Sequence, residues 1–195
     1  MSGEIPEKDT QEQVQEEQHE NERKDNGKKE KKKGNKKQVL SHLWKWVVAA
    51  VVLAVLLLNI FTHIFQIVNY NGTGMEPELQ GGQTLVIRKT QKVEEGDVIA
   101  FYYNNQILVR RVICEGGKEI EISEQGQVSI GGKPLSEPYV KKFTRGQCDI
   151  SFPYHVKNGT VFVMGDNRLE AMDSRLSDIG TIPVERIIGK VIFTF

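Results

Sequence analysis

The feature that most limits how this chain can fold is a long apolar run, LWKWVVAAVVLAVLLLNIFTHIFQIV, at residues 43–68. A helix of about 20 apolar residues crosses the hydrocarbon core of a bilayer, and Val47–Phe65 has about that length. Trp44 and Trp46 stand where interfacial aromatic residues belong, and Lys45 can reach the lipid headgroups. The run exceeds the apolar core of a cleaved secretory signal, which spans about 7–15 residues. We therefore predict one uncleaved transmembrane helix over residues 43–68.

The segment before this run, residues 1–42, is strongly charged and divided by sign. Acidic residues dominate residues 1–22, lysines dominate residues 23–38, and neither part contains Phe, Trp or Tyr. Such a composition buries too little apolar surface to fold, so we predict a disordered leader. The lysines favour a cytoplasmic amino terminus, with residues 69–195 outside, and contact with anionic lipid. A lysine tract can also bind nucleic acid, but the adjacent helix explains it better, and we expect no nucleic-acid partner.

After residue 69 the pattern changes to short runs in which apolar and polar residues alternate. Examples are TLVIRK at 84–89, DVIAFYY at 97–103 and ILVRRVICE at 107–115, and glycine-containing turns separate them. Further strands are predicted at 119–123, 127–132 and 160–166 and at the end of the chain, the last after one helical turn. These patterns predict a mainly β fold, one antiparallel domain over residues 69–195.

Two cysteines, Cys114 and Cys148, lie in this predicted outer domain. An oxidising compartment permits a disulfide between them, and two free thiols are the equal alternative. Neither cysteine stands in a spacing typical of metal ligands, so we predict no metal site and no cofactor.

Four blocks of the outer domain occur in an order that matches one enzyme family. They are GTGMEPEL (72–79), EEGDVIAFYYNNQILVRRVI (94–113), VSIGGKPLSEPYV (128–140) and VFVMGDNRLEAMDSR (161–175). The chain resembles the type I signal peptidases of the shorter Gram-positive kind, which are membrane-anchored Ser/Lys endoproteases. The resemblance covers residues 43–195 and implies their β domain and their peptide groove.

The departures from the family pattern fall on the reacting groups. The family's nucleophilic Ser aligns with Gly74, its general-base Lys with Arg110, and the Ser that orients this Lys with Ala171. The resemblance implies that the surrounding frame is retained. Its peptide-binding positions are Gly72, Met75, Pro77, Leu79 and Leu108, and its supporting positions are Asp166, Asn167, Asp173 and Arg175.

The replacements at residues 74 and 110 remove the chemistry of acyl transfer. That reaction needs an attacking hydroxyl and a base that is neutral at working pH. Glycine supplies no hydroxyl, and an arginine stays protonated in proteins, whereas a buried lysine can lose its proton. The neighbouring Thr73 points to the opposite face if the segment is extended. A buried Arg110 should pair with a carboxylate, for which Glu78 is a candidate, or point to solvent.

Other residues of the blocks carry predictions of their own. Asp173 and Arg175 lie on one side of an extended chain, where we expect an ion pair that supports the site. Met75 fits either the core or a pocket for small side chains equally well.

Two functions therefore compete. We predict a catalytically inactive, membrane-tethered factor that binds peptides or assists assembly, with exported preproteins or pilin-like proteins as partners. The alternative is an active type I signal peptidase that cleaves exported preproteins. Self-cleaving repressors use a similar β domain, but they need a soluble chain with a DNA-binding module, which the apolar run argues against.

Overall fold

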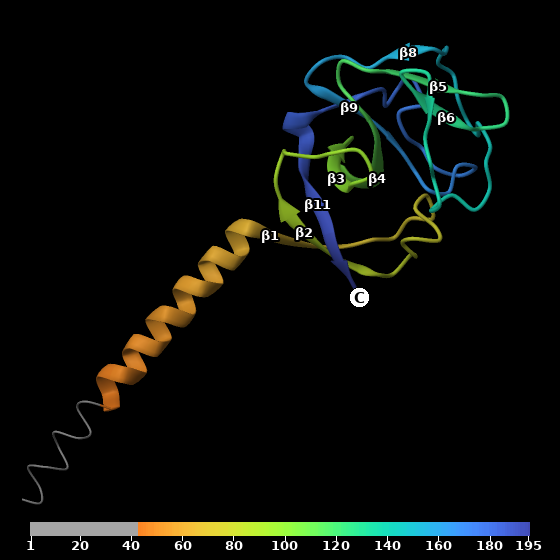
Figure 1. Cartoon of the computed structure of the whole chain (residues 1–195). Helices are drawn as coiled ribbons and strands as arrows, with labels where there is room; N and C mark the ends of the chain where they lie inside the picture. The colour runs from red at the N-terminus through yellow and green to blue at the C-terminus, as the bar shows by residue number, and fades with distance from the viewer. Residues whose placement is uncertain (1–42) are drawn as a thin grey trace, which may run out of the picture. The chain divides into compact units, whose positions relative to one another are not determined.

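The structure is a computed structural model that describes residues 43–195, so the predicted leader over residues 1–42 lies outside the described part. One helix, Leu43–Ile64, is long and apolar enough to cross a membrane (Figure 1). Its 22 residues span about 33 Å, which matches the roughly 30 Å core of a bilayer. Its side chains are exposed along its length, as expected for a helix that has lipid rather than protein as its neighbour.

The helix ends at Ile64, so the predicted end at Val68 is wrong. Strand β1, Phe65–Asn69, follows at once and pairs in antiparallel register with β2, Thr84–Lys89. The β-branched residues Ile67 and Val68 favour a strand, and Val68 packs against the buried core. Residues 65–69 therefore satisfy their backbone groups through hydrogen bonds to β2, and not through the helical hydrogen bonds that the apolar run alone would predict.

Most of the remaining elements follow the predicted strands closely. The remaining elements are β3 (Val98–Tyr103), β4 (Gln106–Glu115), β5 (Glu119–Ile122), β6 (Val128–Ile130), β7 (Lys133–Pro134), β8 (Tyr154–His155), β9 (Thr160–Met164), β10 (Ile182–Pro183), a 3₁₀ turn η1 (Val184–Arg186) and β11 (Ile187–Thr194). Three strands of two residues each, β7, β8 and β10, were not predicted. The prediction of a helical turn before the last strand is confirmed by η1.

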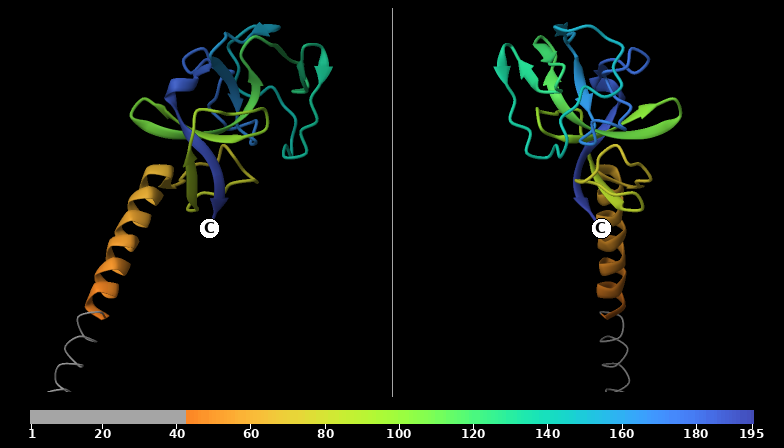
Figure 2. Two further views of the ribbon diagram at one scale, coloured as in Figure 1. Left: turned by 60° about the vertical axis from the view of Figure 1, so that its left-hand side comes forward. Right: turned by 90° about the vertical axis from the view of Figure 1, so that its right-hand side faces the viewer.

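Two antiparallel sheets make up the β domain, which confirms the predicted fold class. The larger sheet has seven strands in the order β1-β2-β11-β3-β4-β9-β10, and the smaller has four in the order β7-β6-β5-β8. The last strand of the chain, β11, lies between β2 and β3, so the chain end closes the middle of the larger sheet (Figures 1 and 2). Strand β4 runs directly on toward β5 and thereby joins the two sheets.

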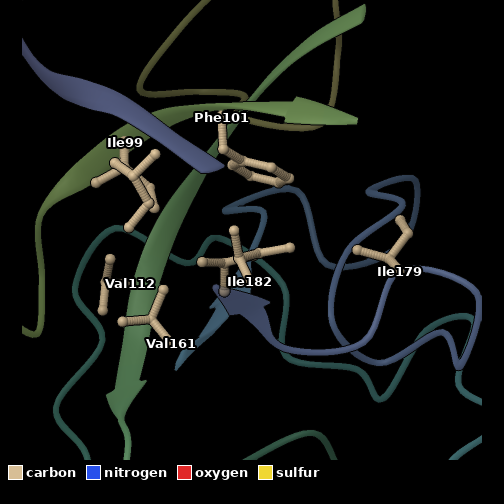
Figure 3. Packing of buried hydrophobic residues seen from close by; sticks show 8 residues of the cluster. Ile99, Phe101, Val112, Val161, Ile179 and Ile182 are labelled. Carbon is tan, nitrogen blue, oxygen red and sulfur yellow. The ribbon is translucent and has the colours of Figure 1, made fainter. Parts of the chain in front are cut away.

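Three clusters of buried apolar side chains fill the domain. One lies between β3, β4, β9 and the loop before β10, and includes Phe101, Ile179 and Ile182 (Figure 3). A second packs under the smaller sheet around Phe162. The third gathers around Met75 and includes side chains of β2, β3 and β4. The long strand β4 is buried from Val109 to Cys114, and this run includes two arginines, Arg110 and Arg111.

Candidate functional site

The segment that carries the first block, residues 73–79, is a compact turn and not an extended strand. The amide of Glu76 donates to the carbonyl of Thr73 (3.1 Å), and the amide of Leu79 donates to the carbonyl of Met75 (2.9 Å). The condition under which Thr73 would point to the opposite face, an extended segment, is therefore not met. The Thr73 hydroxyl donates instead to a carboxylate oxygen of Glu170 at 2.9 Å.

Gly74 is buried against the guanidinium of Arg110. A Cβ atom added at Gly74 would lie 3.1 Å from Nη2 of Arg110 and 3.2 Å from its Cζ and Nη1. Such distances are shorter than nearly all real Cβ contacts, so the guanidinium occupies the space into which a side chain at residue 74 would extend. The guanidinium of Arg110 can therefore lie this close to the backbone only because residue 74 has no side chain.

Backbone carbonyls hold Arg110 in this position. Its Nε donates to the carbonyl of Met172 at 2.9 Å, and its Nη1 donates to the carbonyl of Val109 at 2.6 Å. Within residues 43–195, Arg110 forms no ion pair, and Glu78 is exposed and pairs with no cation. Arg110 was expected to pair with a carboxylate or to point to solvent, and both expectations are wrong. Backbone carbonyls take the place of the carboxylate, and only 6% of Arg110 is exposed. Burial lowers the pKa of Arg110, an effect that the charge of Asp173 opposes, but an arginine remains a cation.

The loop of residues 165–175 covers Gly74 from the other side. The amide of Asn167 donates to the carbonyl of Gly74 at 3.1 Å, and the amide of Ala171 donates to the carbonyl of Asn167 at 3.0 Å. A Cβ added at Gly165 would lie 2.3 Å from both the Gly74 carbonyl oxygen and the Ala171 Cβ, so only glycine fits there. Gly74, Arg110 and Ala171 therefore meet in one place, although they lie far apart in the sequence.

Three buried ion pairs hold this loop: two join it to β4 and to Glu137, and the third lies within it. Their partners are Arg111 with Asp166 (2.6 Å), Arg175 with Asp173 (2.7 Å), and Arg168 with Glu137. The predicted pair between Asp173 and Arg175 is present, and Asp173 also accepts a hydrogen bond from the Gly165 amide at 2.9 Å. Charged hydrogen bonds of this kind hold a loop more firmly than neutral ones.

The five predicted peptide-binding residues do not lie together. Met75 and Leu79 are 0% and 3% exposed and belong to the core around Tyr70, whereas Leu108 packs against the separate cluster of Phe101. Gly72 and Pro77 are half-buried. Pro77 lines a cavity of about 320 Å³ beside the site, whose other walls are Glu76, Gln80, Lys141, Lys142, Asp166, Asn167, Arg168 and Leu169.

The structure adds two groups that the sequence did not indicate. The hydroxyl oxygen of Tyr70 accepts a hydrogen bond from the Met75 amide at 3.1 Å, and its ring covers Gly72. Burial raises the pKa of Tyr70, so this phenol stays protonated at neutral pH. An aromatic residue directly before the glycine-containing block was the available signal. The second group is the Met172 carbonyl, which no sequence pattern could assign.

Both cysteines are free thiols, which decides between the two alternatives that the sequence left open. Cys114 is buried, and desolvation raises its pKa to about 11. Within residues 43–195, no group of His, Cys, Asp and Glu side chains is arranged to hold a metal ion.

An antiparallel β domain that follows an apolar helix and carries the four sequence blocks agrees with the architecture expected of a signal-peptidase-like protein. The chain belongs to the family described as signal peptidase, peptidase S26, whose model matches residues 43–195. The resemblance read from the four blocks is thereby confirmed. Together with the helix Leu43–Ile64, this membership indicates a membrane-anchored protein.

Two relatives from Bacillus agree with this assignment. A signal peptidase I of Bacillus amyloliquefaciens is 32% identical over 165 residues, which cover 78% of this chain and 84% of the relative. Signal peptidase I T of Bacillus subtilis (strain 168) is 32% identical over 160 residues, covering 75% and 82% of the two chains. The crystal structure of a signal peptidase I from Enterococcus faecalis V583 aligns with 52% of this chain and 97% of that chain, at 27% identity and a TM-score of 0.43.

Proposed function

We propose that this chain is a non-catalytic signal peptidase homologue that binds segments of exported proteins at the membrane. The observation that carries the proposal is the contact between Gly74 and Arg110, which occupy the positions of the family's nucleophile and general base. Hydrolysis by this route needs a hydroxyl and a neutral amine, and this pair supplies neither. In a comparable serine protease, loss of the nucleophile or of the base alone costs on the order of 10⁶ in kcat.

Nearby hydroxyl groups are engaged in other hydrogen bonds and do not replace the missing nucleophile. Thr73 donates to Glu170, the Ser174 hydroxyl accepts from the Val163 amide at 3.0 Å, and Tyr70 accepts from the Met75 amide. Within the described residues, none of these oxygens has a lysine amine as its partner. The lysine–hydroxyl pair that this family uses to activate its nucleophile is therefore missing around Gly74 among the described residues, and the carboxylate of Glu170 is the one basic group that contacts a hydroxyl there.

The retained frame supports binding in place of cleavage. Signal peptidases act on exported preproteins, whose segments lie extended in the active-site groove. We propose that this chain holds such a segment by strand addition, in which backbone hydrogen bonds give affinity and side-chain pockets give selectivity. The cavity beside Pro77 is the candidate pocket. The partners would be exported preproteins or pilin-like proteins, and the role would be assembly of pili or surface proteins.

The proposed topology places this site outside the cytoplasm. The lysine-rich run before the helix favours a cytoplasmic amino terminus, since positive flanks remain inside. Each lysine near the membrane surface also adds about 1 kcal/mol of attraction to anionic lipid.

The competing proposal is an active signal peptidase, which the 32% identity to two Bacillus signal peptidases favours. Incubation of the purified full chain with a signal-bearing preprotein separates the two. We expect no cleavage. Specific cleavage after a small residue, abolished by Thr73→Val, would refute the inactive reading.

Binding tests the proposal directly. The full chain in detergent is titrated with fluorescent peptides that carry the cleavage region of a signal peptide or a pilin-like segment. Leu169→Glu, which puts a charge on the cavity wall, should weaken binding. Tyr102→Glu is the matched control, because Tyr102 is 54% exposed against 53% for Leu169 but lies away from the cavity. Equal binding by both variants, or no binding by the parent chain, would overturn the proposal.

A further inference from the structure

The buried charges of the β domain do not balance. Four arginines are buried among the described residues, Arg110, Arg111, Arg168 and Arg175, against three carboxylates, Glu137, Asp166 and Asp173. Each carboxylate forms an ion pair with a different arginine, and Arg110 is the one that remains. A buried cation is costly unless an anion accompanies it, so this position lacks the partner that the other three have.

The donors of Arg110 are only partly used. A guanidinium carries five N–H groups, and the hydrogen bonds found here are those from Nε to Met172 and from Nη1 to Val109. Among residues 43–195, Nη2 has no acceptor. Among the described residues, Nε of Arg145 is the only side-chain nitrogen or oxygen that is both fully buried and without a hydrogen-bond partner. Nη2 of Arg110 has no partner either, so it must retain some solvent-accessible surface. A Cβ at Gly74 would lie 3.1–3.2 Å from Cζ, Nη1 and Nη2 alike, so the face of the guanidinium lies against Gly74 and its unused N–H groups are directed along the plane of the group.

This position suits an anion with two oxygens. A guanidinium binds a carboxylate through two parallel N–H donors, and its charge does not depend on pH in the physiological range. A lysine in the same place would be a mobile point charge that burial could neutralise. The replacement thus leaves a permanent, positioned carboxylate receptor.

We propose that Arg110 binds a carboxylate of the peptide held in this site. The proposal rests on the proposed function, because it requires a peptide in the groove. Two sources share this chemistry: the new C-terminal carboxylate of a peptide released by a separate endopeptidase, and an Asp or Glu side chain within an intact segment. If the carboxylate is the new C-terminus, a separate proteolytic reaction must first produce the peptide that this protein binds.

Three fluorescent probes distinguish the sources. They are the peptide Leu-Val-Ala-Ser-Ala with a free C-terminus, the same peptide as a C-terminal amide, and an amide in which Ser is replaced by Asp. Anisotropy titrations use the full chain in detergent at fixed salt. We expect the free acid to bind at least about tenfold more tightly than the plain amide, the lower end for a hydrogen-bonded charge. Tighter binding of the Asp-containing amide alone would assign the carboxylate to a side chain and support the receptor equally.

Variants test whether Arg110 is the receptor. Arg110→Gln should remove the preference for acid over amide, and Arg186→Gln, which removes an exposed arginine elsewhere, should retain it. Equal affinities of the parent chain for all three probes would overturn the carboxylate proposal and leave peptide binding intact. Binding of none of them would overturn both proposals. The acid–amide comparison needs no variant, so it decides the question even where Arg110→Gln fails to fold.

Discussion

A single added methyl group at residue 74 tests whether the guanidinium of Arg110 fills the space beside the backbone there. Gly74→Ala introduces a Cβ at 3.1–3.2 Å from three guanidinium atoms. Gly74 does not have a left-handed backbone conformation, so alanine is compatible with its local geometry. Without a close neighbour, this substitution would stabilise the fold by about 0.4–1 kcal/mol, since alanine restricts the unfolded chain.

The expected magnitude follows from the crowding. Overpacking of a buried site costs typically about 1–3 kcal/mol, which exceeds the gain from alanine. Gly74→Ala should therefore destabilise the parent chain, whereas in an Arg110→Ala background the same change should be neutral or stabilising. The difference is a coupling free energy of about 1–3 kcal/mol between the two positions, within the usual range for residues in contact.

Pulse proteolysis of the full chain in detergent, over a series of urea concentrations, measures the free energy of unfolding of each member of this cycle. Tryptophan fluorescence is unsuitable, because Trp44 and Trp46 both lie on the helix and the β domain has none. Gly81→Ala is the matched control, since its nearest contact would be an ordinary 3.6 Å to the Gly72 carbonyl oxygen. A Gly74→Ala effect equal in both backgrounds within about 0.5 kcal/mol would refute the described contact.

Four further predictions concern restored cleavage, the buried ion pair of Glu137, the access of reagent to the two thiols, and the dependence of stability on pH. The triple variant Gly74→Ser, Arg110→Lys and Ala171→Ser, at the positions that the resemblance aligns with the family's reacting residues, should gain cleavage of a preprotein on a gel. A folded but inactive triple variant would mean that the groove itself has changed. Glu137→Gln leaves the buried Arg168 without its ion-pair partner and should lower the free energy of unfolding by about 3–5 kcal/mol. The control Glu124→Gln breaks an exposed ion pair and should cost under about 1 kcal/mol. Similar costs for the two variants would contradict the buried pairing. At neutral pH, maleimide should label Cys148 and spare Cys114 until denaturation, with no disulfide in non-reduced peptides. Because burial raises the pKa of Cys114 from 9.0 to about 11, the folded state keeps this proton, and stability should fall as pH rises through that window. The loss should be smaller in Cys114→Ala, where buried Tyr70, whose pKa is also raised, still contributes.

The features that depend on local pattern were readable from the sequence. An apolar run determines a membrane-compatible helix because each backbone group is satisfied within the helix, whatever the rest of the chain does. Strands such as β2 and β4 were predicted from alternation, since period-two side chains need one buried face. The ion pair of Asp173 and Arg175 was also predicted, because its partners lie two residues apart.

Contacts between distant segments required the tertiary structure. The sequence placed Glu78 near Arg110, but the fold brings the carbonyls of Val109 and Met172 to it. Likewise, the end of the apolar run forms strand β1 because it pairs with β2, and this pairing cannot be predicted from the local sequence.

The sequence by itself determined that residue 74 has no side chain and that residue 110 bears a permanent charge, since these are properties of single residues. Only the tertiary structure decided that the two lie in tight contact and that Arg110 has no ion pair with a carboxylate among the described residues. The physical reason is that charge compensation and packing are properties of neighbourhoods, and in a sheet the neighbours come from strands and loops far apart along the chain.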